Sequence, residues 1–129
     1  MIVDASALLA ILLDEPDAER FAEALAAASR LHISVVNWLE VAINVDGLDA
    51  ARPIHRFEAL VDLLKIRIEP VSTAQGRLAR RAYQDFGKGR HPARLNLGDC
   101  FAYALAMEMG LPLLFKGNDF ALTDVTSAL

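Results

Sequence analysis

The stretch "LNLGDCFAYALAMEMGLPLLF", residues 95–115, joins an apolar helix to a buried strand. From Leu95 to Met107 the only charged residue is Asp99, and the apolar run around it predicts a buried helix that ends at Gly110. The segment "LPLLF" then has the length and composition of a buried strand. An unpaired carboxylate among apolar neighbours is unfavourable, because such surroundings disfavour its charged form, so Asp99 requires a compensating partner.

The same order of strand and helix recurs along the chain. Short apolar runs at 1–3, 31–34 and 66–71 are predicted strands, and helical periodicity is present at 5–15, 17–30, 35–45, 53–65 and 74–86. Ser34 and Thr73 are the expected N-caps of two of these helices, and Gly87 ends the last of them. Alternating strands and helices predict an α/β fold with a central parallel β-sheet flanked by helices on both faces.

The remaining segments connect these elements. Glycines and a proline in "GKGRHPAR", residues 87–94, predict a loop, and "KGNDFAL", residues 116–122, predicts a turn with a short helical start. "TDVTSAL", residues 123–129, is expected to form a last edge strand. The sequence contains no internal repeat or linker, so residues 1–129 are expected to form a single domain.

Composition excludes several classes of protein. The chain has 129 residues, 54% hydrophobic and 23% charged, which is typical of a globular protein. Its longest apolar stretches are too short to span a membrane, and no secretion signal is recognisable at the N-terminus. One cysteine, Cys100, cannot form an internal disulfide, and no Cys/His cluster suggests a zinc site. We therefore expect a cytoplasmic protein with no membrane partner.

Charge is unevenly distributed along the chain. The formal net charge is −4, but residues 77–94 contain six basic residues and one acid, a net of +5 that leaves −9 for the rest. Such a segment is either a solvated surface or a phosphate-binding edge. If it binds RNA, we favour Arg90 and Arg94, because "GRHPAR" leads directly into the helix that carries Asp99. Lys116, directly after "LPLLF", is a further candidate RNA contact.

Three other acids are isolated in the same way as Asp99. Asp4 is the only charged residue from Met1 to Leu13, and Glu40 is the only formal charge from Leu31 to Val45. Asp119 follows the end of "LPLLF" by four residues. Each acid comes just after a predicted strand or on the helix that follows one. Because the carboxyl ends of parallel strands meet at one edge of a sheet, these four acids can converge there.

Each acid also has an ordinary structural interpretation. Asp4 can be the N-cap of the first helix, and Asp99 can lie in a first turn that Asn96 caps. Asp119 can belong to a simple turn. Glu40 has no cation three or four residues away on its helix, so a local ion pair does not explain it.

Several carboxylates close together cannot all stay ionised without a cation among them. A hard divalent ion such as Mg²⁺ or Mn²⁺ meets that need with oxygen ligands. Such an ion lowers the pKa of a bound water and stabilises charge on a phosphoryl group. The four acids therefore predict a metal site that acts on phosphate esters.

Long stretches of the sequence resemble PIN-domain ribonucleases, specifically the VapC-like toxins of bacterial toxin–antitoxin pairs. The similar segments are "MIVDASALLAIL", "ISVVNWLEVAI" and "HPARLNLGDCFAYALAMEMGLPLLFKGNDF". The resemblance implies a PIN-like three-layer α/β fold. It also implies a catalytic acidic quartet at Asp4, Glu40, Asp99 and Asp119, with the metal held by Asp4, Asp99 and Glu40. Relatives often have two consecutive acids before the Phe, whereas here Asn118 precedes Asp119.

The resemblance further implies an endoribonuclease that cleaves RNA, often tRNA, and depends on Mg²⁺, with Mn²⁺ as a substitute ion. Its implied partners are a VapB-like antitoxin and a second copy of the chain in a homodimer.

Three other assignments are open to an α/β chain with isolated acids. A response-regulator receiver domain needs an acidic pair after its first strand, but Ala5 and Ser6 follow Asp4. A haloacid-dehalogenase phosphatase needs a second Asp two residues after the first, where Ser6 stands. A PIN fold that only binds RNA or a partner, without catalysis, is the remaining alternative, and metal-dependent cleavage of RNA distinguishes it from an enzyme.

Overall fold

The computed structural model describes residues 1–48 and 52–129, with the side chains of 52–54 outside the described part. Among the described helices, none has the length and apolar character needed to cross a membrane. In chain order the elements are β1 (Ile2–Val3), α1 (Ala5–Leu12), α2 (Ala18–Ala27), β2 (His32–Ser34), α3 (Val35–Asp46), α4 (Arg52–Leu63), β3 (Arg67–Glu69), α5 (Thr73–Phe86), α6 (Leu97–Met109), β4 (Leu113–Leu114) and the 3₁₀ turn η1 (Phe120–Leu122).

The four strands form one parallel sheet in the order β3-β2-β1-β4. Ile2 pairs with His32 on one side and with Leu113 on the other, so the first strand lies at the centre. The carboxyl ends of all four strands therefore lie at the same edge of the sheet. The predicted α/β fold with a central parallel sheet is confirmed.

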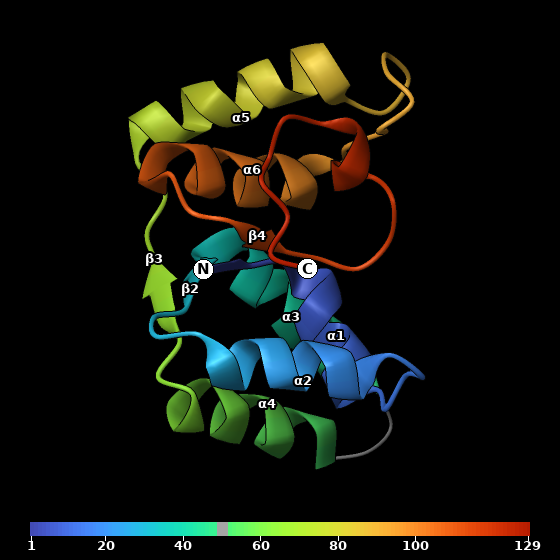
Figure 1. Cartoon of the computed structure of the whole chain (residues 1–129), viewed down its shortest axis with the longest axis vertical. Coiled ribbons are helices and arrows are strands. Elements are labelled where there is room, and N and C mark those ends of the chain that lie inside the picture. The colour runs from blue at the N-terminus through green and yellow to red at the C-terminus, as the bar shows by residue number, and fades with distance from the viewer. Residues whose placement is uncertain (49–51) are drawn as a thin grey trace.

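Helices cover both faces of this sheet (Figure 1). Successive strand residues point to opposite faces: Val3 packs in a hydrophobic cluster with α1, α2, α3 and α4, whereas Ile2 packs in a second cluster with α5 and α6. Helix α6 lies against that second face, and α5 packs on the side of α6 that is farther from the sheet. The result is a three-layer arrangement, and α3 also contacts α6 beside the sheet.

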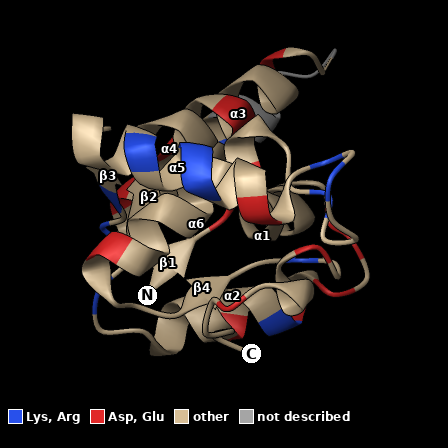
Figure 2. Cartoon of the chain, turned by 90° about the horizontal axis from the view of Figure 1, so that it is seen from above, with Lys and Arg blue, Asp and Glu red and all other residues tan. Residues whose placement is uncertain are grey.

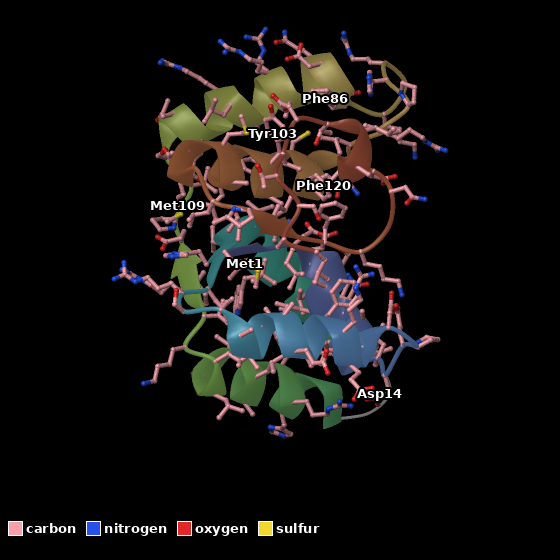
Figure 3. The ribbon with its side chains drawn as sticks, viewed as in Figure 1. Met1, Asp14, Phe86, Tyr103, Met109 and Phe120 are labelled. Carbon is pink, nitrogen blue, oxygen red and sulfur yellow. The ribbon has the colours of Figure 1, made fainter. Side chains whose placement is uncertain are left out.

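Aromatic side chains pack α5 and the C-terminal segment against their neighbours. Phe86 and Tyr103 lie with their ring centroids 5.8 Å apart, and the Tyr103 hydroxyl donates to Asp124 at 2.8 Å. Phe120 packs against Phe115 at a centroid distance of 5.1 Å. Figure 3 shows Phe86, Tyr103 and Phe120 on the α5–α6 side of the sheet, while Asp14 lies at the opposite end of the molecule. The C-terminal segment is thereby fixed against α6.

Several helix caps follow the sequence, although α1 ends at Leu12 and α2 at Ala27, short of the predicted ends at 15 and 30. Ser34 caps α3 as predicted, with its hydroxyl accepting from the Val36 amide. Gly110 ends α6 at φ +61°, a conformation that glycine adopts without strain. The prediction of Thr73 as a cap was wrong: Ser72 accepts from the Gln75 amide, and Thr73 is the first residue of α5. Both residues can cap a helix, and sequence alone did not separate the two neighbours.

The prediction of an edge strand at 123–129 was also wrong. This segment makes one isolated parallel bridge, between Leu113 and Ser127, and no strand. Thr123 donates through its hydroxyl to the Phe120 carbonyl, and Asp124 accepts from Tyr103. These side-chain bonds hold the start of the segment in a loop, and β4 offers only two residues for pairing.

Candidate active site

Asp4 leaves the sheet at the end of β1 and caps α1. Its Oδ2 atom accepts from the Ser6 amide at 3.0 Å and from the Ser6 hydroxyl at 2.5 Å. Among the described residues, no hydrogen bond reaches its Oδ1. The side chain is buried, with the residue 4% exposed. Burial raises the pKa of Asp4, the bonds from Ser6 oppose that rise, and the charge of Glu40 adds to it.

Ser6 connects Asp4 to the end of β4. While its hydroxyl donates to Asp4, its oxygen accepts from the Lys116 amide at 2.9 Å. One side chain thus joins the carboxyl ends of two adjacent strands. The Asp4 carboxylate is held in a single orientation as a consequence.

Asp99 is the third residue of α6 and forms a reciprocal cap with Asn96. The Asp99 amide donates to Asn96 Oδ1 at 2.9 Å, and the Asn96 amide donates to Asp99 Oδ2 at 2.8 Å. Burial raises the pKa of Asp99 to about 6, the bond from Asn96 opposes the rise, and the charges of Asp4 and Asp119 add to it. The structural cap considered from the sequence is therefore present, and Oδ1 remains outside it.

Glu40 lies in the middle of α3 and faces α6. Its Oε2 accepts from Asn37 Nδ2 at 3.4 Å. Burial raises the pKa of Glu40, the bond from Asn37 opposes that rise, and the charge of Asp99 adds to it. Glu40 is thus within electrostatic reach of both Asp4 and Asp99.

Asp119 is exposed in the turn that precedes η1. Its one connection to the other acids is its charge, which helps to raise the pKa of Asp99. Asn118 beside it is exposed too, and its carbonyl accepts from the Ala121 amide at 3.2 Å. The fourth predicted acid is therefore at the rim of the group.

The charges of the four acids act on one another at the carboxyl edge of the sheet, but the acids do not form a closed ligand set. Within residues 1–48 and 52–129, no three Asp, Glu, His or Cys side chains are arranged to hold one metal ion. In the same part of the chain, none of the four acids forms a salt bridge. Carboxylates that raise one another's pKa without a cation suit a hard divalent ion, and Asp4 and Asp99 each have one oxygen outside their caps.

Basic residues lie on α5 and on the loop after it. Figure 2 shows the basic positions on α5. Arg90 and Arg94 are exposed in the loop and line a surface hollow of about 500 Å³. Arg90 places its guanidinium carbon 5.6 Å from the Tyr83 ring centroid, and Arg94 has φ +55°. Neither arginine forms a salt bridge with another described residue, so both can contact phosphates.

Lys116 differs from these two arginines. Its ammonium pairs with Glu15 and with Asp17, the latter at 2.8 Å, in the connection between α1 and α2. A phosphate would have to compete with two carboxylates for this side chain. Its backbone amide, by contrast, supports the site through Ser6.

Sequence reasoning missed three residues that shape the acidic edge: Ser6, Asn37 and Gly98. From the sequence, Ser6 served only to exclude two other families, and Asn37 was only an uncharged neighbour of Glu40. The available signal was Asn37 itself, an amide in an apolar helix one turn before Glu40, where burial requires hydrogen-bond partners. Gly98 carried no signal, because its role depends on a contact with another helix.

The family model for the PIN domain matches residues 1–125. The chain is a VapC-like member of the PIN domain family. Ribonuclease VapC28 of Mycobacterium tuberculosis is 48% identical over 130 residues, covering 100% of this chain and 98% of that protein. Ribonuclease VapC of Mycolicibacterium smegmatis is 43% identical over 127 residues, covering 98% of each chain.

Among solved structures, the crystal structure of the toxin VapC20 of Mycobacterium tuberculosis superimposes on this VapC-like chain with a TM-score of 0.75 at 16% identity, covering 97% of this chain and 95% of that one. A toxin–antitoxin complex from Klebsiella pneumoniae gives a TM-score of 0.72 at 20% identity, covering 99% and 97%. At these identities the likeness establishes the shared fold. The predicted PIN-like fold and family are both confirmed.

The acids give a prediction for the metal-free protein. A folded-state pKa of about 6 for Asp99 lies above its ordinary value of 3.8, so the folded state binds more protons than the unfolded state between these values. Stability is therefore expected to fall as pH rises from about 4 to 7, by roughly 1–2 kcal/mol for Asp99 after allowance for solvent screening. Urea unfolding in EDTA at several pH values measures this.

Asp99→Asn provides the reference for that experiment. The amide oxygen can still accept from Asn96, but the group no longer titrates. The variant's stability is expected to depend less on pH over the same range, with the difference from the wild type growing toward pH 7. Parallel curves for the two proteins would contradict the raised pKa of Asp99.

Proposed function

We propose that this chain is a metal-dependent endoribonuclease and the toxin of a toxin–antitoxin pair. The observation that carries the proposal is the group of buried or half-buried carboxylates that raise one another's pKa at the carboxyl edge of the sheet, in a chain of the VapC-like family. Relatives named as ribonucleases cover its whole length, which supports RNA as substrate. We also propose that residues 1–129 act as one PIN domain.

Asp4 and Asp99 would hold the ion, Mg²⁺ or Mn²⁺, through the oxygens that their caps leave over. When bound, such an ion lowers the pKa of a water ligand and stabilises charge on the phosphate. Glu40 would complete the ligand set or orient the attacking water, and Asp119 would add negative charge at the rim. The catalytic set that we propose is Asp4, Glu40, Asp99 and Asp119.

Arg90, Arg94 and, with a competing ion pair, Lys116 are the proposed RNA contacts. The acidic edge repels RNA, and the loop at 87–94 leads directly into α6, which carries Asp99. Basic side chains there would offset that repulsion by contacting phosphates. We propose tRNA as the first substrate to test.

The proposed partners are a VapB-like antitoxin, which would be encoded beside this chain, and a second copy of the chain in a homodimer. The Klebsiella pneumoniae neighbour is described as a toxin–antitoxin complex, which supports an antitoxin partner. A cytoplasmic location follows from this function, because the proposed RNA substrates are found there.

Cleavage of a fluorescent RNA by the purified chain in Mg²⁺ tests the proposal. We expect defined fragments with Mg²⁺ and none in excess EDTA. The alternative is a PIN fold that binds RNA or a partner without catalysis. RNA binding without cleavage at any divalent ion concentration would support that alternative.

The basic loop gives a separate prediction. If Arg90 and Arg94 each contact one phosphate, RNA affinity falls with salt, with a slope of about −0.7 per contact in a plot of log affinity against log salt. Replacing both by Ala is expected to flatten that slope by roughly 1.4. Binding measured from low to moderate salt, with a catalytically inactive variant as the background, provides the slope.

Arg77→Ala, Arg80→Ala on α5 is the matched control, since it removes the same charge from exposed positions farther along the chain from Asp99. A smaller change is expected for this pair than for the loop pair. An unchanged slope in the loop variant would show that the loop is an ordinary solvated surface.

A further inference from the structure

Asn37 is a buried amide between α3 and α6. Its residue is 0% exposed, and Nδ2 donates to the Gly98 carbonyl at 3.0 Å and to Glu40 Oε2 at 3.4 Å. Its Oδ1 is buried and has no hydrogen-bond partner among the described residues. An unsatisfied buried oxygen is unfavourable, and an apolar side chain of similar size would avoid it. Packing alone therefore does not explain an amide at this position.

Gly98 lies against the carboxylate of Glu40. A Cβ atom at Gly98 would be 2.5 Å from Glu40 Oε2, closer than a Cβ atom approaches a non-bonded atom, and 3.2 Å from Glu40 Cδ, so the carboxylate would have to move. Gly98 lies in the first turn of α6 without a positive φ, so backbone conformation does not require glycine there. The missing side chain instead provides the space that the Glu40 carboxylate occupies.

We propose that Asn37 and Gly98 are positioning residues that hold the Glu40 carboxylate against the first turn of α6, beside Asp99. This inference rests on the proposed function and assigns these two residues a part in it. Asn37 fixes one carboxylate oxygen by a hydrogen bond, and Gly98 admits the carboxylate to the helix surface. The second Asn37 bond, to the Gly98 carbonyl, links α3 to α6 and so maintains the spacing of Glu40 and Asp99.

The geometry explains why Glu40 needs such support. It has several rotatable bonds, and among the described residues no cation pairs with it. Repulsion from Asp99 would otherwise turn the carboxylate toward solvent. Groups that orient a ligand in this way typically change metal affinity or activity by about 10–100-fold when removed.

Gly98→Ala is the sharpest test, because alanine is the better helix former and the variant should fold at least as well as the wild type. The added methyl group is expected to displace the Glu40 carboxylate and to weaken Mn²⁺ binding by about 10-fold or more. Gly76→Ala is the matched control: Gly76 also lies in a helix, and a Cβ there meets nothing within 4 Å. Its Mn²⁺ affinity is expected to equal that of the wild type.

Asn37→Ala tests the second residue, with Asn44→Ala as its control. Asn44 is exposed on the same helix and donates to the Glu40 backbone carbonyl, not to its carboxylate. Mn²⁺ binding is expected to weaken by about 10-fold in Asn37→Ala and to stay unchanged in Asn44→Ala. Thermal unfolding of each variant shows whether it is folded. If Asn37→Ala does not fold, Gly98→Ala still decides the test.

A Glu40→Gln background separates positioning from a general structural effect. If Gly98 acts through Glu40, then Gly98→Ala should weaken Mn²⁺ binding little further once the carboxylate is neutral. The same loss in both backgrounds, or wild-type Mn²⁺ affinity in Gly98→Ala, would overturn the inference while leaving the proposed function standing. Absence of Mn²⁺ binding and of RNA cleavage in the wild type would instead overturn the proposed function, and this inference with it.

Discussion

Replacing Asp99 by Asn is expected to reduce RNA cleavage by on the order of 100-fold or more while leaving the fold intact. The amide is isosteric with the carboxylate, and its oxygen can still accept from the Asn96 amide, so the cap of α6 is retained. What the change removes is the negative charge that a divalent ion needs. Asp4→Asn is expected to behave in the same way, because its oxygen can still accept from Ser6. Single-turnover cleavage of a labelled RNA measures the loss.

The metal-free variants are also expected to be at least as stable as the wild type, since each substitution removes one of several mutually repelling charges. Asp62→Asn on α4 is the control, because it removes an exposed acid from the layer that does not contain α6. It should cleave RNA at the wild-type rate. Wild-type cleavage by purified Asp99→Asn protein would refute the proposed mechanism.

Removing the divalent ion is expected to have an effect of similar size. Excess EDTA should abolish cleavage, and added Mg²⁺ or Mn²⁺ should restore it, because without an ion the acidic edge both repels RNA and lacks an activated water. The two hydrophobic clusters that hold the sheet do not include the acids, so the fold should persist in EDTA. Circular dichroism of the same samples checks this, and cleavage that continues in EDTA would exclude a metal-dependent reaction.

The acidic edge was predictable because its acids are isolated in apolar surroundings. A lone charge in an apolar run signals either a cap or a site, and the structure shows that Asp4 and Asp99 form caps with one oxygen each. The two interpretations considered from the sequence are therefore compatible. How closely the acids approach one another was not predictable, since that depends on side-chain conformations across three elements.

The supporting residues were harder to predict, because their roles arise between segments far apart in the chain. Asn37 and Gly98 are 61 positions apart, and Ser6 and Lys116 are 110 apart. A single sequence shows neither pairing. Lys116 shows the same limit, since the sequence does not reveal that Glu15 and Asp17 lie beside its ammonium group.

The fold was predictable where hydrophobic periodicity was strong. The central strands β1 and β2 are buried throughout, and so is the middle of α6 from Ala102 to Ala106, so their apolar pattern identified them. The prediction for the C-terminal segment failed because its alternating pattern is similar to that of a strand. Contacts such as the hydrogen bond from Tyr103 to Asp124 decide its path instead. Tertiary contacts of that kind override local propensity at the ends of a sheet.

The position of a bound ion tests the central proposal most directly. Mn²⁺ has an anomalous X-ray signal, so crystals grown or soaked with it report the site without reference to activity. We expect an anomalous peak between the carboxylates of Asp4 and Asp99, with Glu40 nearby, and no such peak in Asp99→Asn crystals. Crystals in which saturating Mn²⁺ leaves this edge empty, from protein that still cleaves RNA, would contradict the proposed metal centre.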